Sequence, residues 1–309
     1  MPSSKERPMK PCSGTIFQIQ RWSIHDGEGV RSTVFLKGCP LRCKWCANPE
    51  SWNGNPEVLF FQEKCTGCNR CVPVCGEGAI DPGETAGRFS RERCSCCARC
   101  CEVCPTGARK RIGAKVTVED VLQVIRRDAV FYRESGGGVT FSGGEPFAQP
   151  EFLRQLAAAC RRLGIDTAVE TSGYFDWEQV KDIFGLLDGV FVDIKHMDDE
   201  RHRQMTGVGN RGILENIARI SLLHPNTIVR VPLIEEVNAH EQNIRAMGEF
   251  LKNHTRVKGV EFLPYHDFGE AKYRAVGAQG QAFTTPDGAK IAAMKEIIAA
   301  YGIDIVDFK

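Results

Sequence analysis

The sequence predicts an α/β protein in which a parallel sheet forms a partial (β/α)6 barrel and carries an inserted cysteine-rich module. Apolar runs alternate with helical patterns along most of the chain, and this alternation favours parallel strands with right-handed crossovers. Residues 57–112 interrupt the alternation with a stretch rich in Cys, Gly, Arg and Pro. We count about six main strands, too few for an eight-stranded barrel. A partial barrel or an open doubly wound sheet remains, with residues 1–56 and 113–309 as its two parts.

The predicted strands are short apolar runs that follow a loose N-terminal segment. They cover residues 30–36, 139–142, 165–171, 190–194, 228–233, 260–263 and 303–308. The predicted helices have recognisable ends. Thr117 and Asp120 resemble a capping box that opens the first helix, and Gly164 stops the second. Thr285 and Pro286 cap the last helix, which ends at Gly302. The others lie near residues 151–163, 177–187, 214–223 and 241–252.

The overall composition excludes some classes of function. The chain has 309 residues, with 40 Lys and Arg against 39 Asp and Glu, so it offers no basic surface for nucleic acid. Residues 1–10 lack the apolar core of a signal peptide, and no run of about 18 apolar residues predicts a membrane span. We therefore expect a soluble, cytoplasmic protein without a nucleic-acid or membrane partner. We also expect a monomer.

Cysteine is unusually abundant. Ten of the fifteen cysteines lie between Cys65 and Cys104, and three more lie between Cys39 and Cys46. In a long chain without a signal peptide, such dense short spacings favour metal ligation over disulfides. We expect a reducing compartment that is poor in oxygen.

Three of these cysteines share one tight loop. Cys39, Cys43 and Cys46 have the spacing C-x3-C-x2-C. Thiolates bind iron–sulfur clusters, and four irons ordinarily take four cysteines. Three cysteines leave one iron without a protein ligand, and an open coordination position makes a metal site reactive. A structural zinc loop is the alternative, and Cys12 or a cysteine of the insert is available as a fourth ligand.

With Trp45 before its last cysteine, the loop resembles the C-x3-C-x-aromatic-C signature of the radical S-adenosylmethionine (SAM) superfamily. The resemblance implies that the open iron binds the amino and carboxylate groups of SAM. One electron then splits a carbon–sulfur bond and yields a 5′-deoxyadenosyl radical. Residues 142–146, SGGEP, resemble the motif that binds the methionine ammonium. Gly143 and Gly144 permit a close backbone approach there, and Glu145 stiffens the site by hydrogen bonding.

Polar residues also follow the later strands. They are the segments ETSG at 170–173, DIK at 193–195, RVP at 230–232 and PYH at 264–266. Any one of them alone fits a solvated loop. Together they converge, because polar groups at the carboxyl ends of parallel strands mark active sites in α/β folds.

Further segments resemble the glycyl-radical enzyme activating enzymes. Residues 25–31, HDGEGVR, are similar to their DGPGxR motif, with Glu28 where proline is usual. Residues 193–198, with Thr206 and Gly207, resemble the same family, as do residues 263–266.

This resemblance assigns roles to several residues. It implies that Lys195 and His266 contact SAM, and that Asp26 meets a glycine loop of the partner enzyme. Thr171 and Asp193 would hold the cofactor's carboxylate or a nearby monovalent cation. Arg230 is either a cofactor contact or an ordinary charge at the barrel rim, and Glu170 stands where relatives often carry Asp.

The insert holds two C-x2-C-x2-C-x3-C runs, the pattern of a bacterial two-cluster ferredoxin, in which each fourth cysteine ligates the other cluster. The first predicted [4Fe–4S] cluster therefore takes Cys65, Cys68, Cys71 and Cys104, and the second takes Cys94, Cys97, Cys100 and Cys75. Two zinc sites are the alternative. In the second run the choice of ligands stays open, because Cys96 and Cys101 lie between the predicted ligands and can replace them. Cys160 lies on an apolar helix face and is expected in the core.

The family resemblance implies three [4Fe–4S] clusters, SAM as cofactor, a flavodoxin or ferredoxin-type reductant, and a glycyl-radical enzyme as protein substrate. The reaction removes an α-hydrogen from one glycine of that partner. The insert is typical of activators for small-molecule lyases and dehydratases, with isethionate sulfite-lyase or choline trimethylamine-lyase favoured on overall resemblance. Relay of electrons, a structural role and docking of a reductase remain open for the insert. A radical enzyme with another substrate, or an iron–sulfur electron carrier or sensor, is the alternative function.

Overall fold

The computed structural model describes residues 12–83 and 89–308. Its main sheet has eight strands in the order β10-β9-β8-β7-β6-β2-β1-β5. Their bounds are β1 Ser13–Ser23, β2 Arg31–Leu36, β5 Ala114–Thr117, β6 Gly138–Gly143, β7 Asp166–Thr171, β8 Gly189–Asp193, β9 Thr227–Leu233 and β10 Gly259–Pro264. The six strands β2, β6, β7, β8, β9 and β10 pair in parallel, each with the next of these six along the chain. This confirms the expected parallel partial barrel.

Two antiparallel strands extend the barrel on the side of β2. β1 pairs with β2, and β5 pairs with the outer edge of β1. The expectation of a loose segment before residue 30 is therefore wrong for residues 13–23. Much of β1 is exposed, so its sequence lacks the continuous apolar run that marks a buried strand. Residues 1–11 lie outside the described part of the chain.

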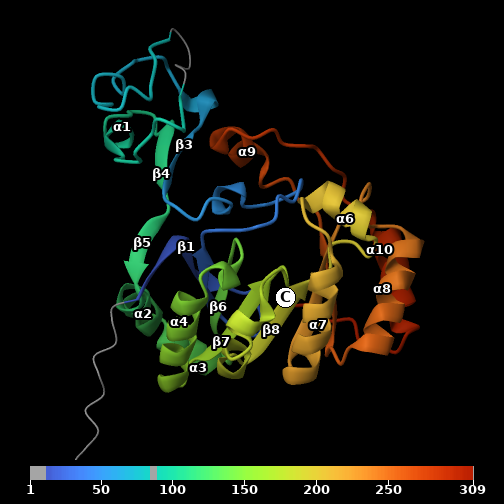
Figure 1. Cartoon of the computed structure of the whole chain (residues 1–309). Coiled ribbons are helices and arrows are strands. Elements are labelled where there is room, and N and C mark those ends of the chain that lie inside the picture. Colours follow the sequence, from blue (N-terminus) through green and yellow to red (C-terminus); the bar gives the residue numbers. More distant parts are fainter. Residues whose placement is uncertain (1–11, 84–88, 309) are drawn as a thin grey trace, which may run out of the picture.

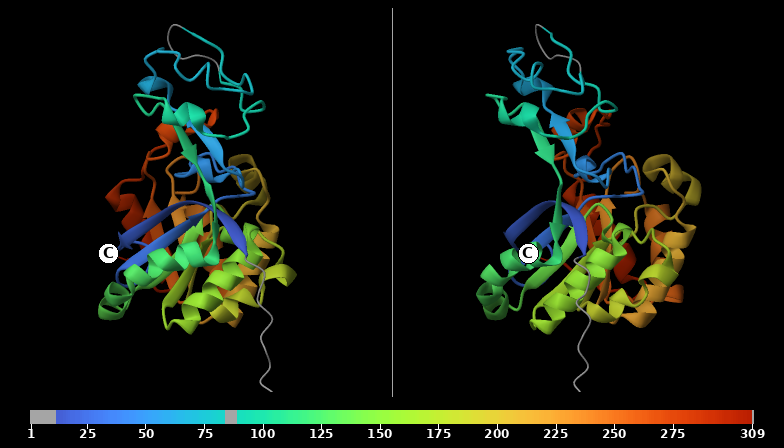
Figure 2. Two further views of the ribbon diagram at one scale, coloured as in Figure 1. Left: turned by 90° about the vertical axis from the view of Figure 1, so that its left-hand side faces the viewer. Right: turned by 60° about the vertical axis from the view of Figure 1, so that its left-hand side comes forward.

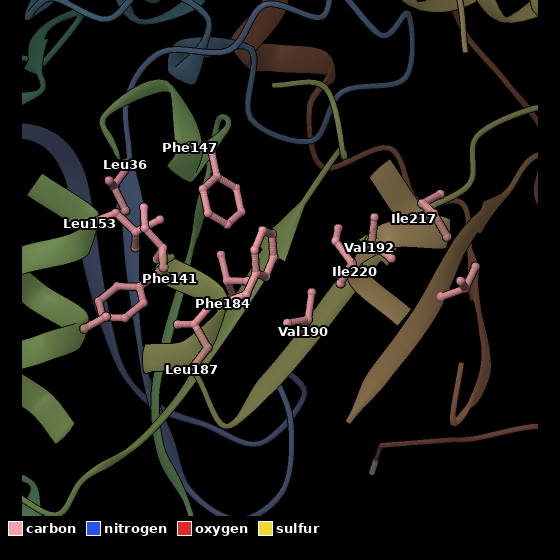
Figure 3. Close-up of a cluster of buried hydrophobic side chains, with 14 of the residues drawn as sticks. Leu36, Phe141, Phe147, Leu153, Phe184, Leu187, Val190, Val192, Ile217 and Ile220 are labelled. Atoms are coloured by element: carbon pink, nitrogen blue, oxygen red, sulfur yellow. The ribbon is translucent and has the colours of Figure 1, made fainter. Parts of the chain in front are cut away.

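Helices cover the outer face of the parallel strands (Figure 1). They are α2 Val118–Arg127, α3 Ala129–Ser135, α4 Pro150–Arg162, α5 Trp177–Val180, α7 Arg211–Leu223, α8 Glu241–His254 and α10 Gly288–Ala299, whereas α6 Asp199–Thr206 and α9 Glu270–Val276 instead contact the segment 38–46. The main core lies between this layer and the sheet, where Phe141, Val190 and Val192 of the strands meet Leu153 and Ile217 of the helices (Figure 3).

Successive side chains of each strand point alternately into this core and into the barrel interior. On β9, Val229 and Val231 belong to the main core, whereas Ile228 packs in a separate inner cluster with Ala168 and Phe191. Residues therefore point alternately outward and inward, as the period of two requires. Apolar side chains fill the interior near the amino ends of the strands, which leaves the carboxyl ends for polar groups.

The observed helix ends agree with the sequence-based predictions in some places and differ in others. Thr117 caps α2, and the reciprocal bonds with Asp120 form the predicted capping box. The last helix differs from the prediction, because Asp287 caps it and accepts from the backbone N–H of Lys290, and it ends at Ala299. The helix predicted over residues 177–187 is split into α5 and a 3₁₀ turn, Ile183–Leu186. The strand predicted over residues 303–308 is reduced to one bridge between Ile305 and Val260.

Residues 57–83 and 89–112 form an arm that stands away from the barrel (Figure 2). β3 Glu57–Phe60 and β4 Arg109–Ile112 pair antiparallel at its base, with Glu57 opposite Ile112. The cysteine runs lie in loops beyond this ribbon, together with the four-residue helix α1 Arg99–Glu102. Within the described parts of the chain, no helix is long and apolar enough to cross a membrane.

Candidate active site

A cavity of about 400 Å³ opens at the carboxyl ends of the parallel strands. Its walls come from the cysteine loop, residues 38–46, and from the segments after β6, β7, β8 and β10. Most of the predicted site residues line it, namely Cys39, Cys43, Trp45, Cys46, Gly143, Gly144, Thr171, Asp193, Lys195 and His266. The structure thus brings together residues that lie up to 227 positions apart, from Cys39 to His266. Asp26 and Glu145 are not part of the wall.

The cysteine loop has no regular secondary structure and is held by backbone bonds to the end of α6. The N–H of Arg42 donates to the carbonyl of Thr206 at 2.7 Å, and the N–H of Lys44 donates to that of Met205 at 3.0 Å. The loop begins with Gly38, whose N–H donates to Ser51 at 2.7 Å. These bonds satisfy backbone groups that a buried irregular loop would otherwise leave unpaired.

The glycine turn after β6 packs directly on the cysteine loop. The backbone N–H of Glu145 donates to the carbonyl of Gly38 at 2.7 Å. A Cβ atom on Gly144 would lie 2.4 Å from that same oxygen, and Gly143 has φ +110° with a Cβ position 2.5 Å from Leu36 O. Only glycine fits both places. The two glycines therefore permit a close approach between two parts of the chain.

Glu145 joins the turn after β6 to the end of β7. Its carboxylate accepts from the hydroxyl of Thr171 and from the backbone N–H of Ser172, each at 2.8 Å. The side chain is buried, and burial raises the pKa of its carboxyl despite these donors. Glu145 therefore stiffens the cavity wall from behind.

Lys195 and Asp193 form an ion pair inside the cavity. Burial lowers the pKa of Lys195, but the charge and hydrogen bond of Asp193, together with the neighbouring Cys43 and Cys39, raise it by more, so the amine stays charged. His266 lies at the exposed edge of the cavity with its ring 4.1 Å from that of Phe268. Trp45 is half-buried and meets Phe283 edge-on at 6.2 Å between ring centroids.

Burial raises the pKa of Cys39 and Cys43 to about 12 and that of Cys46 to about 11. The thiols are therefore neutral without a metal, and binding as thiolates would release their protons. Within residues 12–83 and 89–308, no three His, Cys, Asp or Glu side chains converge on a point that would hold one metal ion. The three thiols of the loop fit a four-iron cluster, because there each thiolate binds a different iron.

Arg230 lies at the floor of the cavity in a charged network. Its guanidinium pairs with Glu170 and, at 2.6 Å, with Glu261, and it donates to the backbone carbonyl of His25 at 3.1 Å. It also lies 3.9 Å from the ring centroid of Phe191. The donors of Arg230 are thus committed to the protein, which favours a structural charge over a cofactor contact.

Asp26 lies apart from the cavity wall, in the loop between β1 and β2. Its carboxylate accepts from the hydroxyl of Thr33, and its backbone carbonyl accepts from Thr140 at 2.7 Å. Glu28, which replaces the usual proline, is exposed and lies 3.8 Å from Lys258 of the opposite barrel edge. This loop therefore reaches across the barrel from β2 toward β9 and β10.

The cysteines of the arm line two further cavities. One is lined by Cys65, Cys68, Cys71 and Cys104, and the other by Cys75, Cys94, Cys97 and Cys100. These are the two sets that the ferredoxin pattern predicts. Among the described residues, Cys96 and Cys101 line neither cavity. Cys160 is buried in the main core, as expected, and Cys12 packs against that core.

Known proteins share these features. A family model described as the radical SAM superfamily matches residues 92–247, and one described as a 4Fe-4S single cluster domain matches residues 25–72. The isethionate sulfite-lyase activating enzyme of Oleidesulfovibrio alaskensis is 42% identical over 94% of this chain and 96% of its own length. The choline trimethylamine-lyase activating enzyme of the same organism is 42% identical over 85% of this chain and 86% of its own.

The chain belongs to the glycyl-radical enzyme activating enzymes of the radical SAM superfamily. A radical SAM methyltransferase from Sphaerobacter thermophilus, 17% identical, shares the fold of this activating enzyme with a TM-score of 0.51 over 89% of this chain and 65% of its own. The family uses an iron–sulfur cluster and SAM, which the donor set of the cavity fits.

Sequence reasoning missed the residues of this activating enzyme that hold the cysteine loop from outside. Tyr273 on α9 contacts that loop, and Lys272 on the same helix contacts Ala47 and Asn48 directly after it. Both residues belong to a short helix with no motif and lie more than 200 positions from the loop. Only the tertiary fold brings them to it.

Arg230→Ala should destabilise the activating enzyme strongly, because it leaves the buried Glu261 and the partly buried Glu170 without their counter-charge. We expect a loss of about 3–5 kcal/mol in the free energy of unfolding, measured by urea denaturation with circular dichroism. Arg245, which pairs with Glu241 on the exposed face of α8, is the matched control, and Arg245→Ala should have little effect. Equal losses in the two variants would contradict the role given to the buried network.

Gly144→Ala should displace the cysteine loop, because the new methyl group would collide with the carbonyl of Gly38. We expect about four fewer irons per chain and no spectral change on adding SAM. The control is Gly185→Ala, whose Cβ would meet no atom within 4 Å. Full iron content and a normal SAM response in Gly144→Ala would rule out this packing argument.

Proposed function

We propose that this chain cleaves SAM reductively and uses the resulting radical to remove an α-hydrogen from one glycine of a partner glycyl-radical enzyme. One observation carries the proposal: three thiols without a fourth and the glycine turn line the same cavity. The membership of the activating-enzyme family supports it. The open side of a partial barrel also suits a protein substrate, because a loop of the partner can enter where a closed barrel would exclude it.

Cys39, Cys43 and Cys46 would hold the reactive cluster through three of its irons. When bound, the cluster supplies the electron that splits SAM into methionine and the 5′-deoxyadenosyl radical. The turn at Gly143 and Gly144 presents backbone groups to the cofactor's ammonium, and Glu145 keeps that turn fixed through Thr171 and Ser172. These residues orient the cofactor and need not move during the reaction.

Other residues of the wall would hold the rest of the cofactor. Lys195 and His266 would contact SAM, and Trp45 would flank it. Thr171 and Asp193 would bind its carboxylate or a monovalent cation. The Asp193–Lys195 ion pair supports this, because both charged groups lie at the cavity surface. Each of them can therefore replace its present partner with a charged group of the ligand. Asp26 would meet the partner's glycine loop from the barrel interior.

Residues 57–112 would form a ferredoxin-like module with two [4Fe–4S] clusters, which raises the total to three. The separation of the eight predicted ligands into two cavities supports the crossed assignment. The module would relay electrons from a flavodoxin or ferredoxin-type protein. None of the fifteen cysteines, which all lie in the described part of the chain, forms a disulfide, and this supports a reducing cytoplasm. We also propose that the protein is a monomer.

The partner would be a lyase or dehydratase that acts on a small molecule, with isethionate sulfite-lyase or choline trimethylamine-lyase favoured. Two relatives at the same 42% identity carry these two different partners in their names, so identity alone does not choose between them. The first test is therefore activation of each candidate by the same preparation.

Reduced protein, SAM and the correct partner should produce a glycine-centred doublet in the EPR spectrum. Cys43→Ala should abolish the doublet, since a ligand of the reactive cluster is lost, whereas Cys160→Ala, a buried thiol of the main core, should preserve it. SAM cleavage without a doublet for any candidate partner would instead favour a radical enzyme with another substrate.

Iron analysis tests the cluster count. The intact chain should hold about twelve irons, and replacing both Cys97 and Cys100 by Ala should remove about four. Cys96→Ala combined with Cys101→Ala is the matched control and should keep all of them, because these thiols line neither cavity. Loss of iron in this control would mean that Cys96 or Cys101 is a ligand of the second run.

A further inference from the structure

Helix α9 contacts both the cysteine loop and the arm. It packs against β3 at the base of the arm and against the 3₁₀ turn Pro49–Ser51, which follows the cysteine loop. Figure 1 shows α9 beside β3, between the arm and the barrel. No motif in the sequence marks this helix, and the proposed chemistry does not use it.

On one side, α9 holds the cysteine loop and the residues directly after it. The hydroxyl of Tyr273, a buried residue, donates to the carbonyl of Cys43 at 3.0 Å. The amine of Lys272 donates to the carbonyl of Ala47 at 3.0 Å and to the side-chain oxygen of Asn48 at 2.8 Å. The loop that would carry the reactive cluster is therefore anchored to α9.

On the other side, α9 holds the second cysteine run. The guanidinium of Arg91 donates to the carbonyl of Val276 at 2.7 Å and to that of Ala275. These carbonyls belong to the last turn of the helix, where no intrahelical donor is available. The carbonyl of Arg91 in turn accepts from the N–H of Cys94 at 3.3 Å. One residue thus links the start of the second run to α9.

The base of the arm indicates independently which of the two cysteine sets lies nearer the barrel. Glu57, the first residue of β3, pairs with the fully buried Lys37 of the barrel at 2.8 Å, so β3 runs away from the barrel. Val58, next to that root, lines the cavity of the second cysteine set. Phe60, two residues farther out, lines the cavity of the first set. The second set therefore lies nearer the barrel.

We propose that the cluster of Cys75, Cys94, Cys97 and Cys100 is the inner relay, that the cluster of Cys65, Cys68, Cys71 and Cys104 is the outer one, and that Arg91 is the positioning residue that holds the inner relay on α9. One electron leaves a reduced one-electron carrier protein, which becomes oxidised, and passes through the outer and then the inner site to the reactive one. The inference rests on the proposed function and adds to it a fixed order.

Magnetic coupling between reduced clusters tests this order without measuring turnover. In frozen reduced protein, a nearby paramagnetic cluster speeds the relaxation of the reactive cluster, which EPR power saturation detects. Replacing Cys65 and Cys68 by Ala should leave most of this effect. Replacing Cys94 and Cys97 by Ala should remove it. The reverse result, or equal losses, would overturn the order.

Arg91 is tested against a neighbour in the same loop. Arg91→Ala should weaken the magnetic coupling and speed hydrogen exchange of residues 270–276 about tenfold, because two charge-assisted bonds to the helix end are lost. Arg91→Lys should restore part of both. The control is Arg93→Ala, because the guanidinium of Arg93 makes a half-exposed contact with Asp81 at 3.7 Å. Unchanged coupling in Arg91→Ala would remove its positioning role.

The proposed function is measured separately, by SAM cleavage in the unaltered chain with a chemical reductant. Cleavage there with no difference between the two cysteine variants in power saturation would refute the relay order alone. Absence of cleavage would refute the proposed function itself. The two failures are therefore distinguishable.

Discussion

The site depends on one constraint: a cysteine loop without secondary structure must keep one conformation, so that three thiols reach three irons of the same cluster. A free loop would lose conformational entropy on binding, which weakens metal affinity. Here the carbonyl of Gly38 accepts from Glu145, the N–H of Arg42 donates to Thr206, and the carbonyl of Cys43 accepts from Tyr273. These partners belong to three segments far apart in the sequence. The global fold therefore preorganises the loop, and local sequence does not.

A second constraint is the charged layer below the cavity. Arg230 is buried between Glu170 and Glu261, and its third partner is the backbone carbonyl of His25. Buried charges are tolerated only where each is paired, and this network has little freedom to rearrange. It separates the apolar filling around Phe191 from the polar cavity above it. The same contact with His25 holds the loop that carries Asp26, so the floor of the cavity and the proposed approach of the partner are mechanically linked.

The parallel strands were predictable because each buried strand is a short apolar run. The sets of candidate cluster ligands were predictable because cluster ligation requires cysteines at characteristic spacings. The capping box at Thr117 is equally local. The missed features need tertiary information. β1 is half-exposed and shows no clear period, and α9 is seven residues long. Gly185 weakens the helix expected after Trp177. The position of Asp26 below the cavity could not follow from a motif, because sequence gives adjacency to the cysteine loop but not the direction in which the chain crosses the barrel.

The attachment of the arm explains how an inserted module can serve a site in the barrel. Its two ends, Glu57 and Ile112, lie opposite each other in one ribbon, so the insertion leaves the parallel strands undisturbed. A ribbon attached only at its root would swing about it. The ion pair of the buried Lys37 with Glu57 fixes the root, and Arg91 fixes a second point on α9. Electron transfer falls steeply with distance, so a swinging module would be a poor relay. Two separate anchors restrain the swing, and both lie on the side of the second cysteine run.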